Sequence, residues 1–468
     1  MERQQLFLHL FYLMNSQMIR LSMRTTAQYS FKLPEPAGQL LVKKVVSLLA
    51  IALFQPVIIR SSVWMVVAYC NMLYYKYYFG EGSWEMKIGI VGNYGNNNNG
   101  DEAILLGLIK QVTSTLHIDT NQITVFSNNP EQTSKRYGVE SYPLYYRTGN
   151  PATTFLKTYK VNKKIVQTFD MLIIGGGGIL MDLYKREAPL YGSYAMMAQR
   201  SNVPYAIYAC GAGPLHTKLG KWFIRQMSMK ANYVSVRDPE SAALLYSLGI
   251  EKNIRVFGDP AFYLRRENTP HKSDKPKKIG VTAVPYYNKD YWPEGNEELY
   301  QNYIEGMARN LDALAEENED VEITFFATKF PQDANVTKDI QRLMQHRDKT
   351  MIIDENLLPE DILDVVEKQD VVIGTRLHSL ILSLCTSTPI IAISYHHKVK
   401  DFMDHVGLSA FNVPMEQLHE NNEFFAEAFG EMKLNWQSTV LETEELSKKL
   451  YSESEKATLQ LTGEIAES

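Results

Sequence analysis

The chain has 468 residues, enough for two or three domains with buried cores. Its composition of 45% apolar and 22% charged residues is ordinary for a globular protein, and a net charge of -5 argues against bulk electrostatic binding to nucleic acid or anionic lipid, although a local basic site is compatible with it. The widely spaced Cys70, Cys210 and Cys385 encode neither a disulfide framework nor a zinc site, which fits a reducing cytoplasm.

Residues 1–85 differ from the rest of the chain and are rich in Met, Leu and Tyr. Their most apolar run, VVSLLAIALFQPVII, contains Gln55 and Pro56 and is shorter than the ~20 residues that cross a bilayer. No small-residue cleavage signature follows it. Two interpretations stay open: an upstream extension of a chain whose natural start is Met86, or a membrane-associated anchor flanked by basic residues.

From residue 87 onward, short β-branched runs alternate with amphipathic helical stretches, which is typical of parallel α/β sheets. We predict two doubly wound domains, 86–265 and 275–425, facing each other across a cleft. A helical segment at 426–468 is expected to pack along the surface or to cross back to the first domain. The polar stretch LRRENTPHKSDKPKK is typical of the linker between the domains. Strands are predicted at 87–91, 122–127, 170–178, 204–213, 233–238, 254–260, 277–284, 321–328, 350–355, 370–376 and 389–395.

The first predicted strand leads into the loop GNYGNNNNGDE at the start of a helix. Its glycines do not have the dinucleotide-binding spacing, and it lacks the Gly-Lys-Ser/Thr of a P-loop. Asp101 and Glu102 at the helix start would repel an anion. The loop is therefore better suited to sugar hydroxyls than to phosphate, although an Asn/Gly-rich turn is by itself simply a turn.

Four glycines, Gly175 to Gly178, follow a buried apolar run. A tight turn needs only one or two glycines, so this run indicates that something approaches the backbone closely. Further along, Arg237 ends a strand, and Asp238 and Pro239 begin a helix as N-cap and first residue. Arg237 is either paired with a neighbouring carboxylate or an anion ligand facing the cleft.

The stretch DVVIGTRLHSLILSLCTSTPIIAISYHHK gives the strongest signal. A strand ends at Gly374, Thr375 can cap the next helix, and Arg376, Leu377 and His378 open it. Free backbone N–H groups at that helix start form an anion site together with Arg376. His378 in the first turn can exchange protons near neutral pH, although a lone histidine is often only structural. The following strand delivers Tyr395, His396, His397 and Lys398, and clustered cationic groups are costly unless an anion joins them.

The stretches GNYGNNNNGDEAIL, IIGGGGIL, GAGPL, VSVRDPES, VFGDPAF and GTRLHSLILSLCTSTPIIAISYHHK together resemble the polysaccharide pyruvyltransferase family of bacterial cell-wall and exopolysaccharide synthesis. The resemblance spans about 86–410 and is most specific at GTRLHS. It implies two Rossmann-like domains in a GT-B-like fold. It also implies transfer of pyruvyl from phosphoenolpyruvate to two hydroxyls of a sugar, as a cyclic ketal, without metal or other cofactor.

The resemblance also implies roles for individual residues. His378 would be the catalytic acid/base, and the C-terminal domain would hold the donor. The donor-binding residues would be Arg237, Arg376, Leu377 and Lys398. The N-terminal domain would hold the acceptor, with Asn93, Asn96, Asp101, Gly176 and Gly177 in its cleft loops. The acceptor sugar is either free or lipid-linked, which places the protein in the cytoplasm or at the inner face of the plasma membrane as a peripheral protein.

Two other interpretations are weighed against this one. A sugar-nucleotide glycosyltransferase of the GT-B fold would usually show an acidic ribose contact and a pyrophosphate-binding loop, where GTRLH offers an arginine and a histidine. A carbohydrate-binding or membrane-tethering module that lost turnover would have little need of Arg376, His378 and Lys398. The sequence does not indicate which sugar is modified or the oligomeric state, and no nucleic-acid partner is expected.

Overall fold

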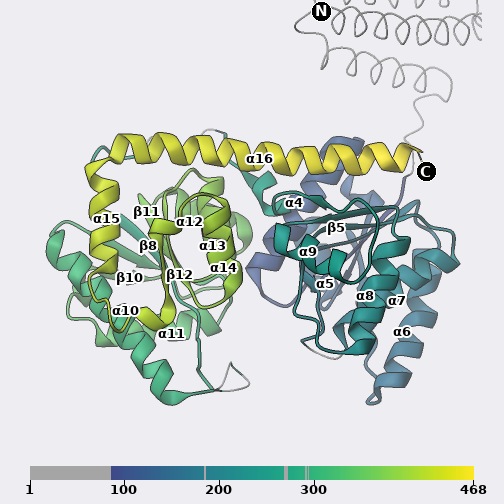
Figure 1. The fold of residues 1–468 in the computed structure, drawn as a ribbon, viewed down its shortest axis with the longest axis horizontal. Helices are drawn as coiled ribbons and strands as arrows, with labels where there is room; N and C mark the ends of the chain where they lie inside the picture. The colour runs from purple at the N-terminus through teal and green to yellow at the C-terminus, as the bar shows by residue number, and fades with distance from the viewer. Residues whose placement is uncertain (1–85, 184–185, 268–271, 290–291, 293–294, 468) are drawn as a thin grey trace, which may run out of the picture. The chain divides into compact units, whose positions relative to one another are not determined.

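The computed structural model describes residues 86–183, 186–267, 272–289, 292 and 295–467. The predictions for residues 1–85 therefore lie outside the described residues. Residues 85–468 form one unit. Within it, two parallel sheets confirm the predicted fold class of two Rossmann-like α/β domains (Figure 1).

The first sheet has seven parallel strands in the order β3-β2-β1-β4-β5-β6-β7. The chain therefore runs outward from β1 in one direction, returns, and continues from β4 in the other direction. The bounds are β1 Ile88–Val91, β2 Ile123–Ser127, β3 Glu140–Pro143, β4 Met171–Leu180, β5 Tyr205–Ala212, β6 Tyr233–Val236 and β7 Arg255–Val256.

The second sheet repeats this plan with six parallel strands in the order β10-β9-β8-β11-β12-β13. The strand order of each sheet reverses once, between β1 and β4 and between β8 and β11, and ligands of such sheets bind at the carboxyl ends of the strands there. The bounds are β8 Lys278–Thr282, β9 Glu322–Phe325, β10 Thr350–Ile352, β11 Val371–Gly374, β12 Ile390–Ser394 and β13 Asn412–Pro414.

Every predicted strand overlaps an observed one, whereas β3 and β13 were not predicted. Both are short edge strands, ESYP and NVP, whose residues are mostly half-buried or exposed. A central strand is buried on both faces and needs a continuous apolar run, but an edge strand of three or four residues does not. The pattern that revealed the central strands is therefore missing from these two.

Helices cover both faces of the first sheet. Buried residues of α6, α7, α8 and α9 pack together with one face, and buried residues of α4 pack with the other. The bounds are α4 Asn99–Leu116, α5 Pro130–Tyr137, α6 Pro151–Val166, α7 Glu187–Arg200, α8 Lys218–Lys230 and α9 Pro239–Ser247.

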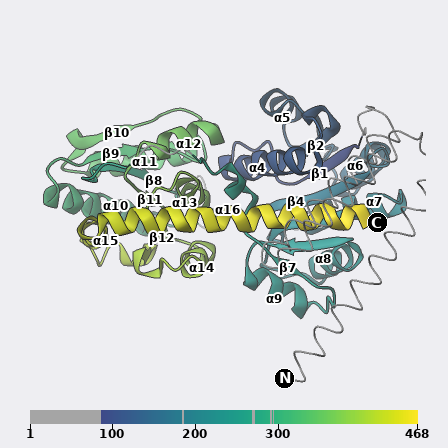
Figure 2. The same cartoon turned by 90° about the horizontal axis from the view of Figure 1, so that it is seen from above.

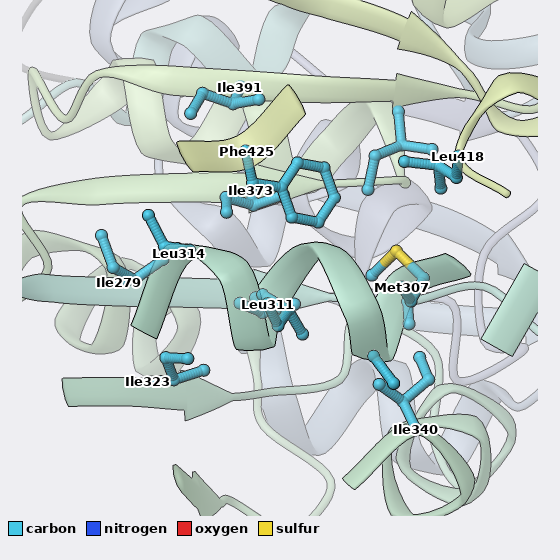
Figure 3. Close-up of a cluster of buried hydrophobic side chains, with 14 of the residues drawn as sticks. Ile279, Met307, Leu311, Leu314, Ile323, Ile340, Ile373, Ile391, Leu418 and Phe425 are labelled. Atoms are coloured by element: carbon cyan, nitrogen blue, oxygen red, sulfur yellow. The ribbon is translucent and has the colours of Figure 1, made fainter. Parts of the chain in front are cut away.

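The second sheet has its own core, in which α10 and α15 pack over the strands (Figure 3). Met307 and Leu311 of α10 are fully buried beside Ile279 of β8 and Ile373 of β11. The bounds are α10 Glu297–Glu317, α11 Gln332–Leu343, α12 Pro359–Glu367, α13 Leu377–Cys385, α14 His397–His405, α15 Phe424–Leu434 and α16 Trp436–Glu467, with short 3-10 helices at Thr120–Gln122, Pro260–Leu264 (η2), Arg347–Lys349, Ser409–Phe411 and Met415–Gln417.

The final helix, α16, crosses back from the second domain to the first, the second of the two predicted courses (Figures 1 and 2). Ala457 and Leu461 lie in the core on the α4 face of the first sheet. The side chain of Gln111 on α4 donates a hydrogen bond of 2.7 Å to the hydroxyl of Ser454. Helix α16 therefore packs against both domains.

Candidate functional site

His378 lies in the first turn of α13, directly against the start of α4. A Cβ atom added to Gly100 would come within 2.5 Å of the His378 Nδ1 atom, so only glycine leaves room for the imidazole. The other ring nitrogen, Nε2, lies 3.6 Å from Oδ2 of Asp259, which is beyond hydrogen-bond distance. Nε2 is buried and makes no hydrogen bond to any described residue. A ligand could therefore bind it or exchange a proton with it.

Asp259 links His378 to Arg237. It follows β7 and is 4% exposed, and its Oδ2 lies 3.3 Å from Nη1 of Arg237. Its other oxygen accepts a 3.0 Å hydrogen bond from the backbone N–H of Ala261. Burial by itself would raise the pKa of Asp259, but His378 and Arg237 lower it below its ordinary value. This carboxylate is therefore charged and faces two cationic or titratable groups.

Arg237 follows β6, and its side chain is 8% exposed. Asp238 is the N-cap of α9 and Pro239 is its first residue, as predicted. The Nε atom of Arg237 lies 3.7 Å from the carboxylate of Asp238. Gly211 of β5 leaves room for the guanidinium, since a Cβ atom at position 211 would approach it to 3.0 Å. The pairing interpretation is confirmed, because Arg237 contacts two carboxylates, whereas its role as an anion ligand stays a prediction.

Lys398 reaches this cluster from the second domain. A Cβ atom added to Gly178 of β4 would lie 2.9 Å from the Lys398 Nζ atom. Burial, helped by the nearby charge of Arg237, lowers the pKa of Lys398 to about 8, although Asp101 acts in the opposite direction. His396 is the N-cap of α14, and burial together with its cationic neighbours lowers its pKa to about 4. Near neutral pH, His396 is therefore uncharged.

The Asn-rich loop after β1 holds Asp101 next to the same cluster. Asn93 and Asn98 donate hydrogen bonds of 3.0 and 2.9 Å to Oδ2 of Asp101, and Asn96 donates one of 2.8 Å to Asn93. Burial raises the pKa of Asp101, while His378 opposes this shift. The loop also contacts the second domain, because the backbone N–H of Asn99 donates to the carbonyl of Thr328 at 3.0 Å.

The glycine run lies inside β4 rather than after it. Gly175 and Gly176 are explained by packing, because added Cβ atoms would meet the Tyr208 carbonyl at 2.5 Å and the Ile104 side chain at 2.3 Å. Gly177 and Gly178 instead face the polar cluster, where added Cβ atoms would meet Asp101 at 3.1 Å and Lys398 at 2.9 Å. Gly176 and Gly177 have positive φ angles of 77° and 72°, which favour glycine.

Two details at the start of α13 differ from expectation. Thr375 does not cap the helix, because its buried hydroxyl donates to the carbonyl of Thr282 at 3.2 Å, and the N-cap is Arg376. The Arg376 guanidinium binds the fully buried Asp333 through two bonds, 2.6 Å from Nη2 and 3.2 Å from Nε. The backbone N–H groups of Leu377 and His378 are at the first two helical positions, which lack intrahelical acceptors.

A pocket of about 540 Å³ opens beside the Asn-rich loop in the first domain. It lies at the carboxyl ends of β1, β2 and β3, and its lining includes Asn93 and Asn96. Arg147 and Arg186 also line it, and both guanidinium groups lie within 5.7 Å of the ring centre of Tyr145. His378, Arg237 and Lys398 are not among the lining residues. Asn93 joins the two regions, since it lines the pocket and binds Asp101.

Comparison with known proteins identifies the family. A model of the family described as polysaccharide pyruvyl transferase matches residues 98–397, more than half of the chain. The chain belongs to the polysaccharide pyruvyl transferase family. It is 22% identical over 386 residues to the amylovoran biosynthesis protein AmsJ of Erwinia amylovora, covering 72% of this chain and 90% of that protein.

Solved structures show that this pyruvyl transferase family member has a GT-B-like fold. UDP-N-acetylglucosamine 2-epimerase of Neisseria meningitidis superposes with a TM-score of 0.55 at 11% identity, over 82% of this chain and all of that one. HepE of Anabaena, solved with UDP and glucose, gives a TM-score of 0.54 at 10% identity, over 81% of this chain and 99% of that one. At such identities the likeness concerns the fold alone.

Among the predicted site residues of this pyruvyl transferase family member, the structure brings Arg237, His378, Lys398 and Asp101 together. Sequence reasoning missed Asp259, which connects the first two. Its signal was an Asp-Pro pair after a strand, the same as Asp238-Pro239, and such a pair reads as a helix start. Among the described residues, no group of three or more His, Cys, Asp or Glu side chains could hold a metal ion.

Proposed function

We propose that the protein transfers the pyruvyl group of phosphoenolpyruvate to two hydroxyls of one sugar in a bacterial polysaccharide or its precursor. The product is a cyclic ketal, and phosphate is released. The observation that carries this proposal is the meeting of Arg237, Lys398 and His378, from the two domains, around the partly exposed Asp101 and the buried Asp259. Family membership supports the pyruvyl transfer to a polysaccharide, and AmsJ, an amylovoran biosynthesis protein, is a relative that fits this role.

The cluster suits a donor with a carboxylate and a phosphate. Such a trianion needs fixed cations and backbone N–H groups. Arg237 and Lys398 supply the charges, and the amides of Leu377 and His378 supply donors at a helix start, where anions are favoured. Arg376 is also a proposed donor-binding residue, because it directly precedes that helix. Its guanidinium is bound to Asp333. With this charge neutralisation, the proposed reaction needs no metal or other cofactor.

His378 is the proposed acid. Its protonated imidazole gives a proton to the methylene carbon of phosphoenolpyruvate, and C2 becomes an oxocarbenium-like centre. One sugar hydroxyl adds to C2, the C2–O bond to phosphate breaks, and the second hydroxyl adds to close the ring. Of the two hydroxyl protons of the diol, one replaces the proton that His378 gave to the methyl carbon and the other leaves with phosphate. Arg237 and Lys398 stabilise the departing phosphate.

The pocket beside the Asn-rich loop is the proposed acceptor site. It adjoins the cluster through Asn93 and offers the amide groups of Asn93 and Asn96, which suit sugar hydroxyls. Gly177 would let the acceptor approach the backbone next to Asp101. Because phosphoenolpyruvate is a cytoplasmic metabolite, we place the reaction in the cytoplasm, at the inner face of the plasma membrane where the acceptor is lipid-linked. Among the residues that the structure describes, no helix has the length and apolar character to span a membrane.

The full chain is tested with carbon-labelled phosphoenolpyruvate and glycan precursors extracted from polysaccharide-producing bacteria. We expect phosphate release that depends on the glycan, together with a glycan whose mass increases by one pyruvate less water. EDTA should leave the rate unchanged. Parallel incubations with nucleotide sugars measure release of nucleoside diphosphate. Nucleoside diphosphate release without consumption of phosphoenolpyruvate would identify a glycosyltransferase and refute this proposal.

A further inference from the structure

The layer of α6, α7 and α8 is basic on two of its helices, although the whole chain is acidic. Helix α6 contains Lys157, Lys160, Lys163 and Lys164, and α8 contains Lys218, Lys221, Arg225 and Lys230. Neither helix contains an aspartate or a glutamate. The chain as a whole has a net charge of -5. Positive charge is therefore concentrated on these two helices.

The same face also exposes large apolar side chains. On α8, Leu219 is 57% exposed and Trp222 is 51% exposed, and on α6 Leu156 is exposed as well. Lys218, Trp222 and Met229 lie at positions i, i+4 and i+11, so basic and apolar residues share one stripe of α8. Exposed large apolar groups among basic residues are typical of helices that lie in a membrane interface.

The two basic helices face outward from one layer. Buried residues of α6, α7 and α8 pack on the same face of the first sheet, so their opposite sides point away from it (Figure 1). Helix α7 lies between the other two and contacts both of them. Arg200 of α7 donates a hydrogen bond of 3.1 Å to Tyr159 of α6. Between α7 and α8, a groove of about 180 Å³ is lined by Trp222, Phe223 and Lys230 among others.

We propose that this face, formed by the outer sides of α6 and α8, docks on an anionic lipid bilayer. Lysine and arginine side chains place their charges at the lipid phosphates, while Trp222, Leu219 and Met229 enter the interface. A nucleic acid or an acidic polysaccharide would bind the charges but would have no use for the exposed leucine and methionine. This inference goes beyond the proposed transferase activity and does not depend on it.

The test reports on α8 itself, because residues 1–85 contain apolar runs and vesicle binding by the whole chain would not show which segment is responsible. In the full chain with Cys70→Ser, a nitroxide is attached at Leu219→Cys, since Cys210 and Cys385 are buried. The control label is at Met351→Cys on the second domain, where the native side chain is 58% exposed. With phosphatidylethanolamine–phosphatidylglycerol vesicles, we expect the label at 219 to enter the lipid and the label at 351 to stay in water. A label at 219 that stays in water overturns the proposal.

Charge reversal provides a second arm. Lys218→Glu with Lys221→Glu should lower partitioning of the 219 region into these vesicles at least tenfold, because each basic residue contributes about fivefold at an anionic surface. The same reversal at Lys448 and Lys449, exposed on α16, is the control and should have little effect. Phosphatidylcholine vesicles should bind weakly. If polygalacturonate immobilises the 219 label and vesicles do not, the face binds a polymer, and the membrane proposal is wrong.

Discussion

His378 at the start of α13 and Asp259 after β7 face each other at 3.6 Å, between His378 Nε2 and Asp259 Oδ2. The two residues come from different domains, and Arg237 approaches the same carboxylate oxygen at 3.3 Å. One buried carboxylate therefore positions Arg237, the proposed donor-binding cation, and His378, the proposed acid, together. The lowered pKa of Asp259 keeps this carboxylate charged beside the imidazole that is the proposed proton donor.

We predict that His378→Gln loses about 100- to 10,000-fold in kcat while phosphoenolpyruvate still binds, because glutamine keeps hydrogen bonding but cannot exchange the proton. Phosphate release gives the rate, and calorimetry with phosphoenolpyruvate gives the affinity. His396→Gln and His397→Gln are the controls. His396 is the weaker candidate for an acid, since its pKa is lowered to about 4. If His378→Gln turns over normally and one of the controls is inactive, the role moves to that residue.

Lys398 should make donor binding depend on pH. Its pKa of about 8 means that its charge is present below pH 8 and is lost as the pH rises through that value. The KM for phosphoenolpyruvate should therefore increase above pH 8, by up to about tenfold per pH unit for one proton. Lys398→Arg should flatten this dependence, because arginine stays charged. An unchanged rise in KM in that variant would assign the titration to another group.

Gly178→Ala should weaken donor binding without unfolding the protein. The new methyl group would meet Lys398 Nζ at 2.9 Å and Met181 Cε at 2.8 Å, and both are ends of flexible side chains that can move. We expect a KM increase of roughly tenfold, since shifts of about an ångström cost up to ~100-fold. Gly430→Ala, with no atom within 4 Å of the new Cβ, is the silent control. A folded Gly178→Ala protein with the normal KM would show that Lys398 does not bind the donor.

The central strands and the order of the motifs could be predicted from the sequence, because buried parallel strands need continuous apolar runs, as in MLII of β4 and VVIG of β11. The position of Arg237 after a strand and that of His378 in the first turn of a helix followed from the same pattern. The packing role of Gly175 and Gly176 could not be predicted, because the residues that they contact, Tyr208 and Ile104, are distant in sequence.

The pairing of charged residues could not be predicted from the sequence for a similar reason. Arg376 and Asp333 are 43 residues apart, and nothing local marks the aspartate as its partner. Thr375 does not cap the helix as expected, because its hydroxyl donates a hydrogen bond to the carbonyl of Thr282 on the neighbouring strand β8. A cap is chosen by local geometry, whereas a buried hydroxyl bonds to whatever acceptor the sheet provides.

Arg376→Ala should reduce stability strongly. It would leave the fully buried Asp333 without its two guanidinium bonds, and breaking a buried pair in this way costs about 3–5 kcal/mol. Arg342→Ala is the matched control, because Arg342 pairs with Asp339 on the same helix α11 but at the surface, where such pairs contribute about 0–1 kcal/mol. Thermal midpoints of the full chain measure both. If Arg376→Ala keeps its midpoint and loses only phosphoenolpyruvate affinity, its main role is donor binding.

The last prediction separates the acceptor pocket from the donor cluster. Arg147 and Asn96 line the pocket, whereas Arg237 and Lys398 lie in the cluster. Arg147→Gln and Asn96→Ala should therefore raise the KM for the acceptor glycan, by roughly tenfold for loss of one bond to a ligand. The KM for phosphoenolpyruvate should stay the same.

Arg237→Gln provides the reciprocal case, with a raised KM for phosphoenolpyruvate and little change for the glycan. Because Arg147 is exposed and its guanidinium contacts Tyr145, its loss removes little packing, so an altered KM would reflect binding rather than folding. Lys135→Gln, a change of the same charge on the neighbouring helix α5 and outside the pocket lining, is the control. If Arg147→Gln and Asn96→Ala alter donor KM as much as glycan KM, the pocket and the cluster bind one substrate, and the division into donor and acceptor sides is wrong.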